Sequence, residues 1–188
     1  MLPILKTDRL LLRNISIDDA LDMYEYAKTT KVGPSAGWEP HVSIEETKLI
    51  IKLFKDNASK TGLGTFAIIW KETGKMIGTI EIYNVKINHS GVLGYSLSDK
   101  YWGRGIMVEA CHAVISWAIA NLHLQRIEIS LFVDNHQSER VCEKLGFTYE
   151  GIRRKGYNKY NSEAVDEKIY SLTDNDYFKY KEEGLYGY

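Results

Sequence analysis

A short loop with two glycines is the stretch of the sequence whose residue types point most directly to chemistry. It reads Tyr101-Trp102-Gly103-Arg104-Gly105-Ile106-Met107 and lies between an apolar run and a long helical pattern. Because glycine has no Cβ, the backbone at Gly103 and Gly105 can approach a ligand closely, and the first N–H groups of the following helix lack partners within the helix. These N–H groups, the helix dipole and the charge of Arg104 attract negative groups. The loop therefore predicts an anion site.

A second group of polar residues, Asn135-His136-Gln137-Ser138, follows further along the chain. An asparagine side chain can hydrogen-bond both the donor and the acceptor of an amide, and a serine hydroxyl can donate to a leaving group. The alternative for Ser138 is a structural role near the start of a helix, where serine is common. Cys142 lies one turn beyond Ser138, and the sequence places no histidine base beside it. A covalent role for this thiol is therefore disfavoured.

A predicted strand, helix and strand position these two groups. An apolar strand is expected at 92–98, a helix at 106–122 and a β-rich strand at 126–133. Ala110 and Val114 belong to an apolar stripe at helical spacing, which predicts that one face of this helix packs on a sheet. A strand, a helix and a second strand make one parallel crossover. The glycine loop then lies where the first strand leads into the helix.

The rest of the chain completes the sheet and adds helices. Strands are expected at 7–15, 66–70, 76–83 and 164–172, and helices at 17–28, at 44–58 and after the N-cap Thr173. The strands 66–70 and 76–83 are joined by a glycine-bearing turn of hairpin length and should pair antiparallel. The segment 29–41 is expected to be a loop, in which Trp38 either fills the core or overhangs a substrate.

The composition favours a single domain spanning residues 1–188. A chain of 188 residues with 44% hydrophobic residues can bury one sizeable core, but not two. Its formal net charge of -1 gives no basic surface of the kind that nucleic-acid binding uses. Cys111 and Cys142 show no metal-ligand spacing, so no metal site is expected. The sequence shows neither a secretory signal nor an apolar run of membrane-spanning length, so we expect a cytoplasmic protein.

The residues from Gly91 to Gly151 resemble the acetyl-CoA half of the GNAT acetyltransferases. Within that superfamily the sequence is similar to the RimJ/RimL-like branch, which acetylates N-termini of ribosomal proteins. In the family the loop reads Gln/Arg-x-x-Gly-x-Gly/Ala; Gly105 keeps the central glycine, whereas Trp102 and Met107 depart from the outer positions. The resemblance implies an α/β (α+β) fold with a mixed, mostly antiparallel central sheet, splayed at its middle and flanked by helices.

The resemblance also implies acetyl-CoA as co-substrate, with its pyrophosphate at the glycine loop and its pantetheine amides at Asn135, where the splayed sheet leaves backbone groups unpaired. Ser138 matches the serine that RimL-like enzymes are thought to use near the sulfur. Cys142 occupies the place of a tyrosine that many relatives use to protonate the thiolate. The cofactor-binding residues expected on this basis are Leu97, Trp102, Gly103, Arg104, Gly105, Ile106, Met107, Asn135, Ser138 and Cys142.

The general base is the least defined of the expected residues. Many relatives carry a glutamate on the strand before the loop, but this sequence has Gly91-Val92-Leu93-Gly94-Tyr95 there. Glu81 lies on the neighbouring strand, where alternation places it on one face with Thr79 and Tyr83. Ser138 and Glu81 are therefore the predicted catalytic residues. Alternatively, Glu81 is merely solvated and the enzyme only positions the amine, since an α-amine with a pKa near ~8 is already partly neutral.

The predicted function is direct transfer of an acetyl group from acetyl-CoA to a primary amine, above all the N-terminal α-amine of a protein. Trp38 and Tyr157, the latter in a loop before the last strand, are the predicted acceptor contacts. One alternative is acetylation of a small amine such as a polyamine, an amino acid or an aminoglycoside. Another is a non-catalytic CoA-binding protein. The chain is expected to be a monomer or homodimer, with neither nucleic acid nor membrane as a partner.

Overall fold

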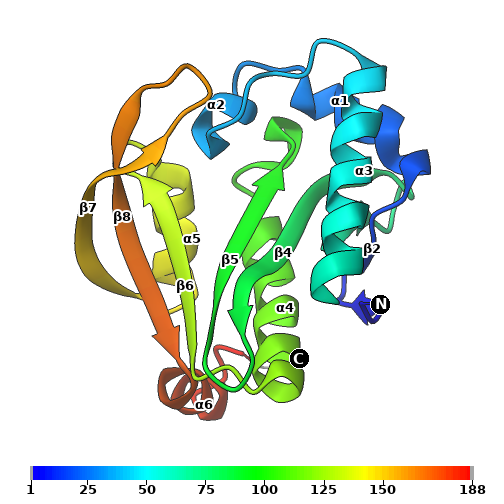
Figure 1. Ribbon diagram of the computed structural model, residues 1–188. Helices are drawn as coiled ribbons and strands as arrows, with labels where there is room; N and C mark the ends of the chain where they lie inside the picture. The colour runs from blue at the N-terminus through cyan, green and yellow to red at the C-terminus, as the bar shows by residue number, and fades with distance from the viewer. Residues whose placement is uncertain (1, 187–188) are drawn as a thin grey trace.

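Eight strands form one mixed sheet, and helices pack on both of its faces (Figure 1). The computed structural model describes residues 2–186. In chain order the elements are β1 (Leu5–Lys6), β2 (Leu10–Asn14), the 3₁₀ helix η1 (Ile17–Asp19), α1 (Ala20–Ala27), α2 (Gly33–Ala36), α3 (Ile44–Thr61), β3 (Thr65–Trp70), β4 (Met76–Lys86), β5 (Ser90–Leu97), the 3₁₀ helix η2 (Asp99–Tyr101), α4 (Ile106–Leu122), β6 (Arg126–Phe132), α5 (His136–Lys144), β7 (Thr148–Asn158), β8 (Ala164–Thr173) and α6 (Asp174–Glu182).

The strands lie in the order β1-β2-β3-β4-β5-β6-β8-β7, and every neighbouring pair is antiparallel except β5 with β6. These two are parallel because α4 crosses over between them. They pair at only three positions, from Ser90 opposite Arg126 to Val92 opposite Glu128. Beyond these positions β5 and β6 separate (Figure 1). The predicted mixed, mostly antiparallel sheet that splays at its middle is therefore confirmed.

Apolar side chains are buried on both faces of the sheet. On one face α4 packs over the strands, and Val114 is fully buried with Ile80 and Ile127 in the larger cluster. On the other face α1 and α3 cover β2 to β4, where Ile51 packs with Ile69 in a second cluster. Burial of this kind is the main source of stability, at about 25 cal/mol per Å² of apolar surface. The two clusters hold the strands in place up to the point where β5 and β6 separate.

Polar caps fix where two helices begin, at the positions that the sequence predicts. Thr173 forms a capping box with Asp176 at the start of α6. Ser43 caps α3 by accepting a hydrogen bond from the Glu46 N–H at 3.1 Å, whereas the Glu46 side chain reaches back to the N–H of Val42 rather than of Ser43. In the part of the chain described here, none of the helices has the length and apolar content of a membrane span.

The structure differs from the predicted elements at three places. The segment 29–41 contains a four-residue helix, α2, whose sequence Gly33-Pro34-Ser35-Ala36 gives no helical periodicity. β4 runs on to Lys86 through a bulge after Tyr83, so the turn to β5 covers only 87–89. Tyr157 lies in β7 and not in a loop before β8, because β7 continues through an irregularity in its pairing with β8.

Candidate active site

The separation of β5 from β6 opens a cavity of about 1030 Å³ at the middle of the sheet. On one face of the sheet it is lined by the loop before α4 and by α5, and on the other by β4, α2 and the end of β7. Ligand pockets usually measure about 300–1,000 Å³. The cavity is therefore large enough for an extended ligand that meets a second, smaller one.

The glycine loop forms one end of this cavity. Gly103 and Gly105 are both left-handed, with φ of 75° and 72°, a conformation that other residues adopt only at a cost. Gly105 is the N-cap of α4 and offers no side-chain cap, so the N–H groups of the first turn stay open to a ligand. A Cβ at Gly103 would meet none of the described atoms within 4 Å. This geometry suits the predicted anion site.

A buried carboxylate, that of Glu109 in the first turn of α4, ties the loop to the N-terminal strands. Its Oε1 accepts hydrogen bonds from Thr7 Oγ1 at 2.5 Å and from the Arg9 N–H at 2.9 Å, and its Oε2 accepts one from Arg9 Nε at 2.6 Å. Arg9 Nη1 also donates to the Arg104 carbonyl at 3.0 Å. Burial acts to raise the pKa of Glu109, but the hydrogen bonds from Thr7 and Arg9 together outweigh it and lower the pKa. The glycine loop is thus held by the turn between β1 and β2.

Most of the predicted cofactor residues near the loop line the cavity, namely Leu97, Trp102, Gly103, Gly105, Ile106 and Met107. Trp102 Nε1 donates to the Leu97 carbonyl at 2.9 Å, which fixes the indole against the end of β5. Arg104 differs from the prediction, because its exposed side chain does not line the cavity. Its guanidinium instead lies 5.6 Å from the centre of the Tyr101 ring, an arrangement stabilised by cation–π attraction.

Asn135 and Ser138 lie at the start of α5 and line the cavity. Asn135 is the N-cap: its Oδ1 accepts from the Ser138 N–H at 3.1 Å, and its Nδ2 donates to the Ser35 carbonyl at 3.1 Å. The Asn135 side chain, which was predicted to bind the cofactor, therefore connects α5 to α2 in this structure. The Ser138 hydroxyl, in contrast, makes no hydrogen bond that meets geometric criteria within residues 2–186.

Cys142 does not line the cavity, contrary to its prediction as a cofactor contact. It is fully buried on the inward side of α5, and burial raises the pKa of its thiol to about 12. The helix turns other side chains toward the cavity, namely Val141 and the cations Arg140 and Lys144. The two cations follow each other at i,i+4 and so share one side of α5. They are available to a negatively charged ligand.

Glu81 lies on the opposite face of the sheet, where it lines the cavity with Thr79 and Tyr83 as alternation predicts. Thr65 Oγ1 donates to Glu81 Oε2 at 2.6 Å, whereas Oε1 accepts no hydrogen bond from the described residues. Burial raises the pKa of Glu81, and the hydrogen bond from Thr65 lowers it by less. A carboxylate with a raised pKa and one free oxygen is suited to accept a proton.

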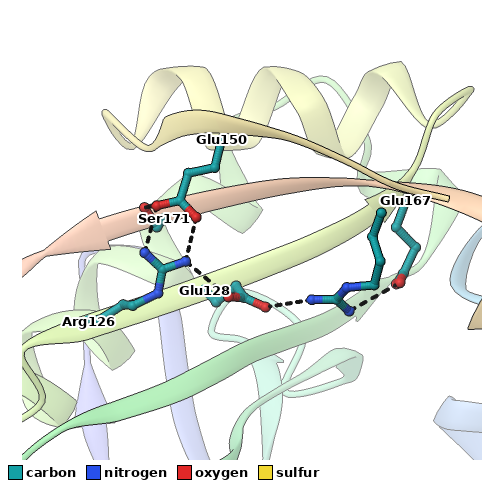
Figure 2. A network of polar contacts seen from close by, with 6 residues as sticks. Arg126, Glu128, Glu150, Glu167 and Ser171 are labelled. Carbon is teal, nitrogen blue, oxygen red and sulfur yellow. Dashed lines mark hydrogen bonds and ion pairs between the residues drawn. The ribbon is translucent and has the colours of Figure 1, made fainter. Parts of the chain in front are cut away.

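Two more carboxylates reach this side of the cavity from β6 and β8 (Figure 2). Arg153 of β7 bridges them, at 3.2 Å from Nη2 to Glu128 Oε1 and 3.3 Å from Nη1 to Glu167 Oε2. Glu128 also accepts a hydrogen bond from Arg126, which pairs with both oxygens of Glu150 at 2.6 Å (Figure 2). Among the side chains that line this side of the cavity, carboxylates therefore outnumber cations.

Residues 33–38 and Tyr157 form a roof that covers part of the cavity above the separated strands. The helix α2 lies beside the β7–β8 hairpin (Figure 1). The Tyr157 ring packs on Gly37, where a Cβ would come within 2.6 Å of the ring. Trp38 packs on Gly33 in the same way, lines the cavity and also contacts the core under α1 and α3. Trp38 therefore packs against the core and borders the cavity at the same time.

The sequence analysis did not predict some of the residues that line the cavity, although the spacing of side chains along their helix or strand indicates them. Arg140 and Lys144 follow helical spacing, and Glu128 alternates with the buried Ile127 and Ile129, so periodicity places all three away from the core. The Arg9–Glu109 contact joins residues 100 positions apart and leaves no local pattern. Within residues 2–186 no group of three or more His, Cys, Asp or Glu side chains is arranged to hold a metal ion.

Comparisons with known proteins agree with this arrangement. A family model described as acetyltransferase (GNAT) domain matches residues 9–148. The N-acetyltransferase YoaA of Bacillus subtilis is 33% identical over 174 residues, which cover 92% of this chain and 97% of that protein. The ribosomal protein uS5-alanine N-acetyltransferase of Escherichia coli is 30% identical over 185 residues, which cover 92% of each. The crystal structure of the ribosomal-protein-S5-alanine acetyltransferase from Vibrio fischeri has a TM-score of 0.75 and 26% identity, and the match covers 93% of this chain and 98% of that one.

The clamp between Arg9 and Glu109 predicts an effect on stability that depends on pH. Glu109→Gln should destabilise the fold by about 1–3 kcal/mol at pH 7, because it removes charge-assisted hydrogen bonds to a buried carboxylate. Since the pKa of Glu109 is lower in the folded state, its contribution is present above about pH 4.3 and is lost as the pH falls through the folded pKa. Urea unfolding of both proteins at pH 7 and at acidic pH measures the difference. The exposed Glu182→Gln is the control, and equal stabilities for all three proteins at pH 7 would contradict the clamp.

Proposed function

The chain belongs to the GNAT acetyltransferase family, and from this premise we propose that it transfers the acetyl group of acetyl-CoA directly to the N-terminal α-amine of a protein. The observation that carries the proposal is the cavity where β5 and β6 separate. The glycine loop borders it on one face of the sheet and Glu81 on the other. A thioester that reaches through the gap from the loop would meet an amine on the side of Glu81.

The cofactor is assigned to the side of the cavity formed by α4 and α5. The free N–H groups at the start of α4 suit the pyrophosphate, and Arg140 with Lys144 supplies positive charge for the phosphates. Backbone groups of β5 and β6 beyond Val92 and Glu128 have no partner across the gap, and the amides of the pantetheine arm can satisfy them. Trp102 and Leu97 provide apolar surface at the end of β5.

The reaction requires one proton to leave the amine and one to reach the sulfur. The neutral amine attacks the thioester carbon, the C–N bond forms, and the C–S bond breaks as its electron pair passes to sulfur. We assign the first proton to Glu81, through a water molecule, and the hydrogen bond to the departing sulfur to Ser138. The thiol of Cys142 is buried away from the cavity, with its pKa raised to about 12, which supports direct transfer without an acetylated cysteine.

One observation supports a protein N-terminus as the acceptor, and a second supports a primary amine of either kind. The Escherichia coli relative, which matches over most of both chains, is named for an alanine of ribosomal protein uS5. On this side of the cavity the carboxylates of Glu81, Glu128 and Glu167 outnumber Arg153, and their charge attracts an ammonium group before it loses its proton.

The roof favours a small amine as the second candidate acceptor. The Asn135–Ser35 hydrogen bond and the packing of Tyr157 on Gly37 cover this side of the cavity. A covered pocket admits a slender alkylamine more readily than a chain end that continues into a folded protein. A protein N-terminus must therefore enter as an extended segment.

A panel of acceptors tests both candidates through the initial rate of CoA release. It consists of peptides with a free N-terminus, the same peptides blocked at the N-terminus but carrying lysine, a polyamine, free amino acids and an aminoglycoside. We expect kcat/KM for the free N-termini to exceed the others at least tenfold, with the acetyl group on the α-amine by mass spectrometry. A higher kcat/KM for a small amine would show that the acceptor is a small molecule, while the proposed acetyl transfer would stand. CoA binding without turnover of any amine would favour a non-catalytic protein.

The proposed pyrophosphate site predicts that the loop glycines affect cofactor affinity beyond any effect on stability. Gly103→Ala and Gly105→Ala should each weaken CoA binding at least tenfold, about 1.4 kcal/mol, because a side chain would stand where the phosphate meets the backbone. Gly74→Ala is the matched control, since Gly74 is also left-handed, at φ 71°, and lies in open space in the β3–β4 turn. Calorimetric titration of the three folded variants with CoA measures this effect. Equal CoA affinities for all three would contradict the assignment of the pyrophosphate to this loop.

The role of Glu81 predicts a change in the pH profile. Glu81→Gln should lower kcat/KM about 10²-fold and abolish the acidic limb, which reports the pKa of the base in the free enzyme. Thr65→Val removes the hydrogen bond that lowers this pKa, so its acidic limb should move to higher pH while the plateau is kept. Profiles of kcat/KM on one peptide amine measure both effects. A loss below tenfold in Glu81→Gln, with a rate that climbs to the pKa of the amine itself, would show that the enzyme only positions its substrate.

A further inference from the structure

A positively charged side chain, that of Arg153, lies at the opening of the cavity on the side of Glu81. Along β4 the side chains of Thr79, Glu81 and Tyr83 share one face of the sheet, and all three line the cavity. Thr79 is 8% exposed and Tyr83 is 42% exposed, so this side of the cavity is closed near Thr79 and opens near Tyr83. The Arg153 side chain lines the cavity too and is 49% exposed. It therefore belongs to the open end.

The carboxylates that hold Arg153 lie near the Tyr83 phenol at this open end. Burial raises the pKa of this phenol, and the charges of Glu81, Glu167 and Glu128 raise it further. Arg153 contacts the last two of these carboxylates, so its guanidinium lies in the same group of charges. An amine that enters at the open end and moves toward Glu81 therefore passes Arg153.

The surroundings of Arg153 hold its side chain against Glu167. Gly156 leaves room for both groups, because a Cβ at this position would come within 2.6 Å of Arg153 Cδ and closer still to Glu167 Oε2. The Glu167 side chain is only 7% exposed, and within residues 2–186 Arg153 is the only side chain that donates a hydrogen bond to its carboxylate. The guanidinium therefore keeps a defined place, although its contacts of 3.2 and 3.3 Å are longer than the 2.6 Å contacts between Arg126 and Glu150 (Figure 2).

Arg153 also sets the charge that an incoming amine meets. The connected network contains three carboxylates and two guanidinium groups, contributed by Glu128, Glu150, Glu167, Arg126 and Arg153. It therefore leaves one negative charge unbalanced, and without Arg153 it would leave two. This arrangement attracts a single ammonium group. A second ammonium group would find Glu128 and Glu167 already paired, and the guanidinium between them would repel it.

We propose that Arg153 is a specificity-determining residue that excludes acceptors with a second positive charge close to the reacting amine. The inference rests on the proposed acetyl transfer and narrows its acceptor to amines with one positive charge, such as a protein N-terminus followed by uncharged residues. Diamines and polyamines are disfavoured, because the guanidinium occupies the carboxylates that would otherwise pair with their second ammonium group. Discrimination between acceptors commonly uses a repulsive element of this kind.

Pairs of acceptors that differ by one ammonium group test this role. Two peptides with norleucine or lysine as the second residue share a four-carbon side chain, and butylamine and 1,4-diaminobutane share a four-carbon chain. For the wild-type protein we expect kcat/KM of the singly charged member to exceed that of the doubly charged one at least tenfold, about 1.4 kcal/mol, with the α-amine of the peptides as the acetylated group by mass spectrometry. In Arg153→Gln this ratio should fall at least tenfold, because glutamine can still donate a hydrogen bond to Glu167 but repels no cation. Salt should lower the wild-type ratio, since it screens charges at an exposed side chain.

Two further variants separate charge from structure. Arg153→Lys keeps the positive charge, so its ratio should stay within threefold of the wild-type value. Arg154→Gln is the matched control, since it removes the same charge from an exposed neighbour that does not line the cavity. An equal loss for both members of each pair in Arg153→Gln, or a wild-type ratio below tenfold in both pairs, would overturn the role of Arg153 and leave the proposed function intact. Absence of acetyl transfer by the wild-type protein to any amine would overturn both.

Discussion

The active site depends on one interrupted pairing in the sheet. β5 and β6 exchange hydrogen bonds at three positions and then separate, while β4 and β8 continue to pair with their outer edges. Beyond these positions the N–H and C=O groups on the inner edges of β5 and β6 have no partner across the gap. Buried backbone groups without partners are costly. A ligand with a row of amides is the natural partner for such an edge, and the cavity lies where it would bind.

Under the proposed function, the same gap divides the reaction between the two faces of the sheet. The glycine loop, Ser138 and Tyr95 lie on the face of α4 and α5, whereas Glu81, Glu128 and Glu167 lie on the other. Burial acts on both sides, because it disfavours the charged forms of the Glu81 carboxyl and of the Tyr95 phenol alike. Under the proposed function, a carboxyl with a raised pKa lies on the side where an amine would enter.

The parts of this site that were predictable from the sequence are those with a local physical signal. The bounds of α4, the position of the glycine loop before it, and the side of β4 that carries Glu81 follow from helical spacing, from the two glycines and from alternation. The helix α2 has four residues and no periodicity to read, and its position depends on contacts with Tyr157 and Asn135, more than a hundred positions away.

Long-range contacts also explain features of the site that local patterns do not show. Cys142 carries the right spacing from Asn135, but the orientation of α5 on the sheet turns it inward. Alternation gives the face of Tyr95, yet whether its hydroxyl finds a partner depends on how α4 and α5 pack above it. The surroundings of both side chains therefore depend on the tertiary structure.

The shortness of the β5–β6 junction also has a mechanical consequence. Three paired positions join the strands β1 to β5 to the strands β6 to β8 within the sheet. We therefore expect the gap between β5 and β6 to open and close more easily than the continuously paired parts of the sheet deform. At the far end of the gap, the Asn135–Ser35 hydrogen bond and the packing of Tyr157 on Gly37 connect the two parts of the molecule. A molecule bound between the strands stiffens this junction from within, so the ligand acts as a structural brace of the fold as well as a reactant.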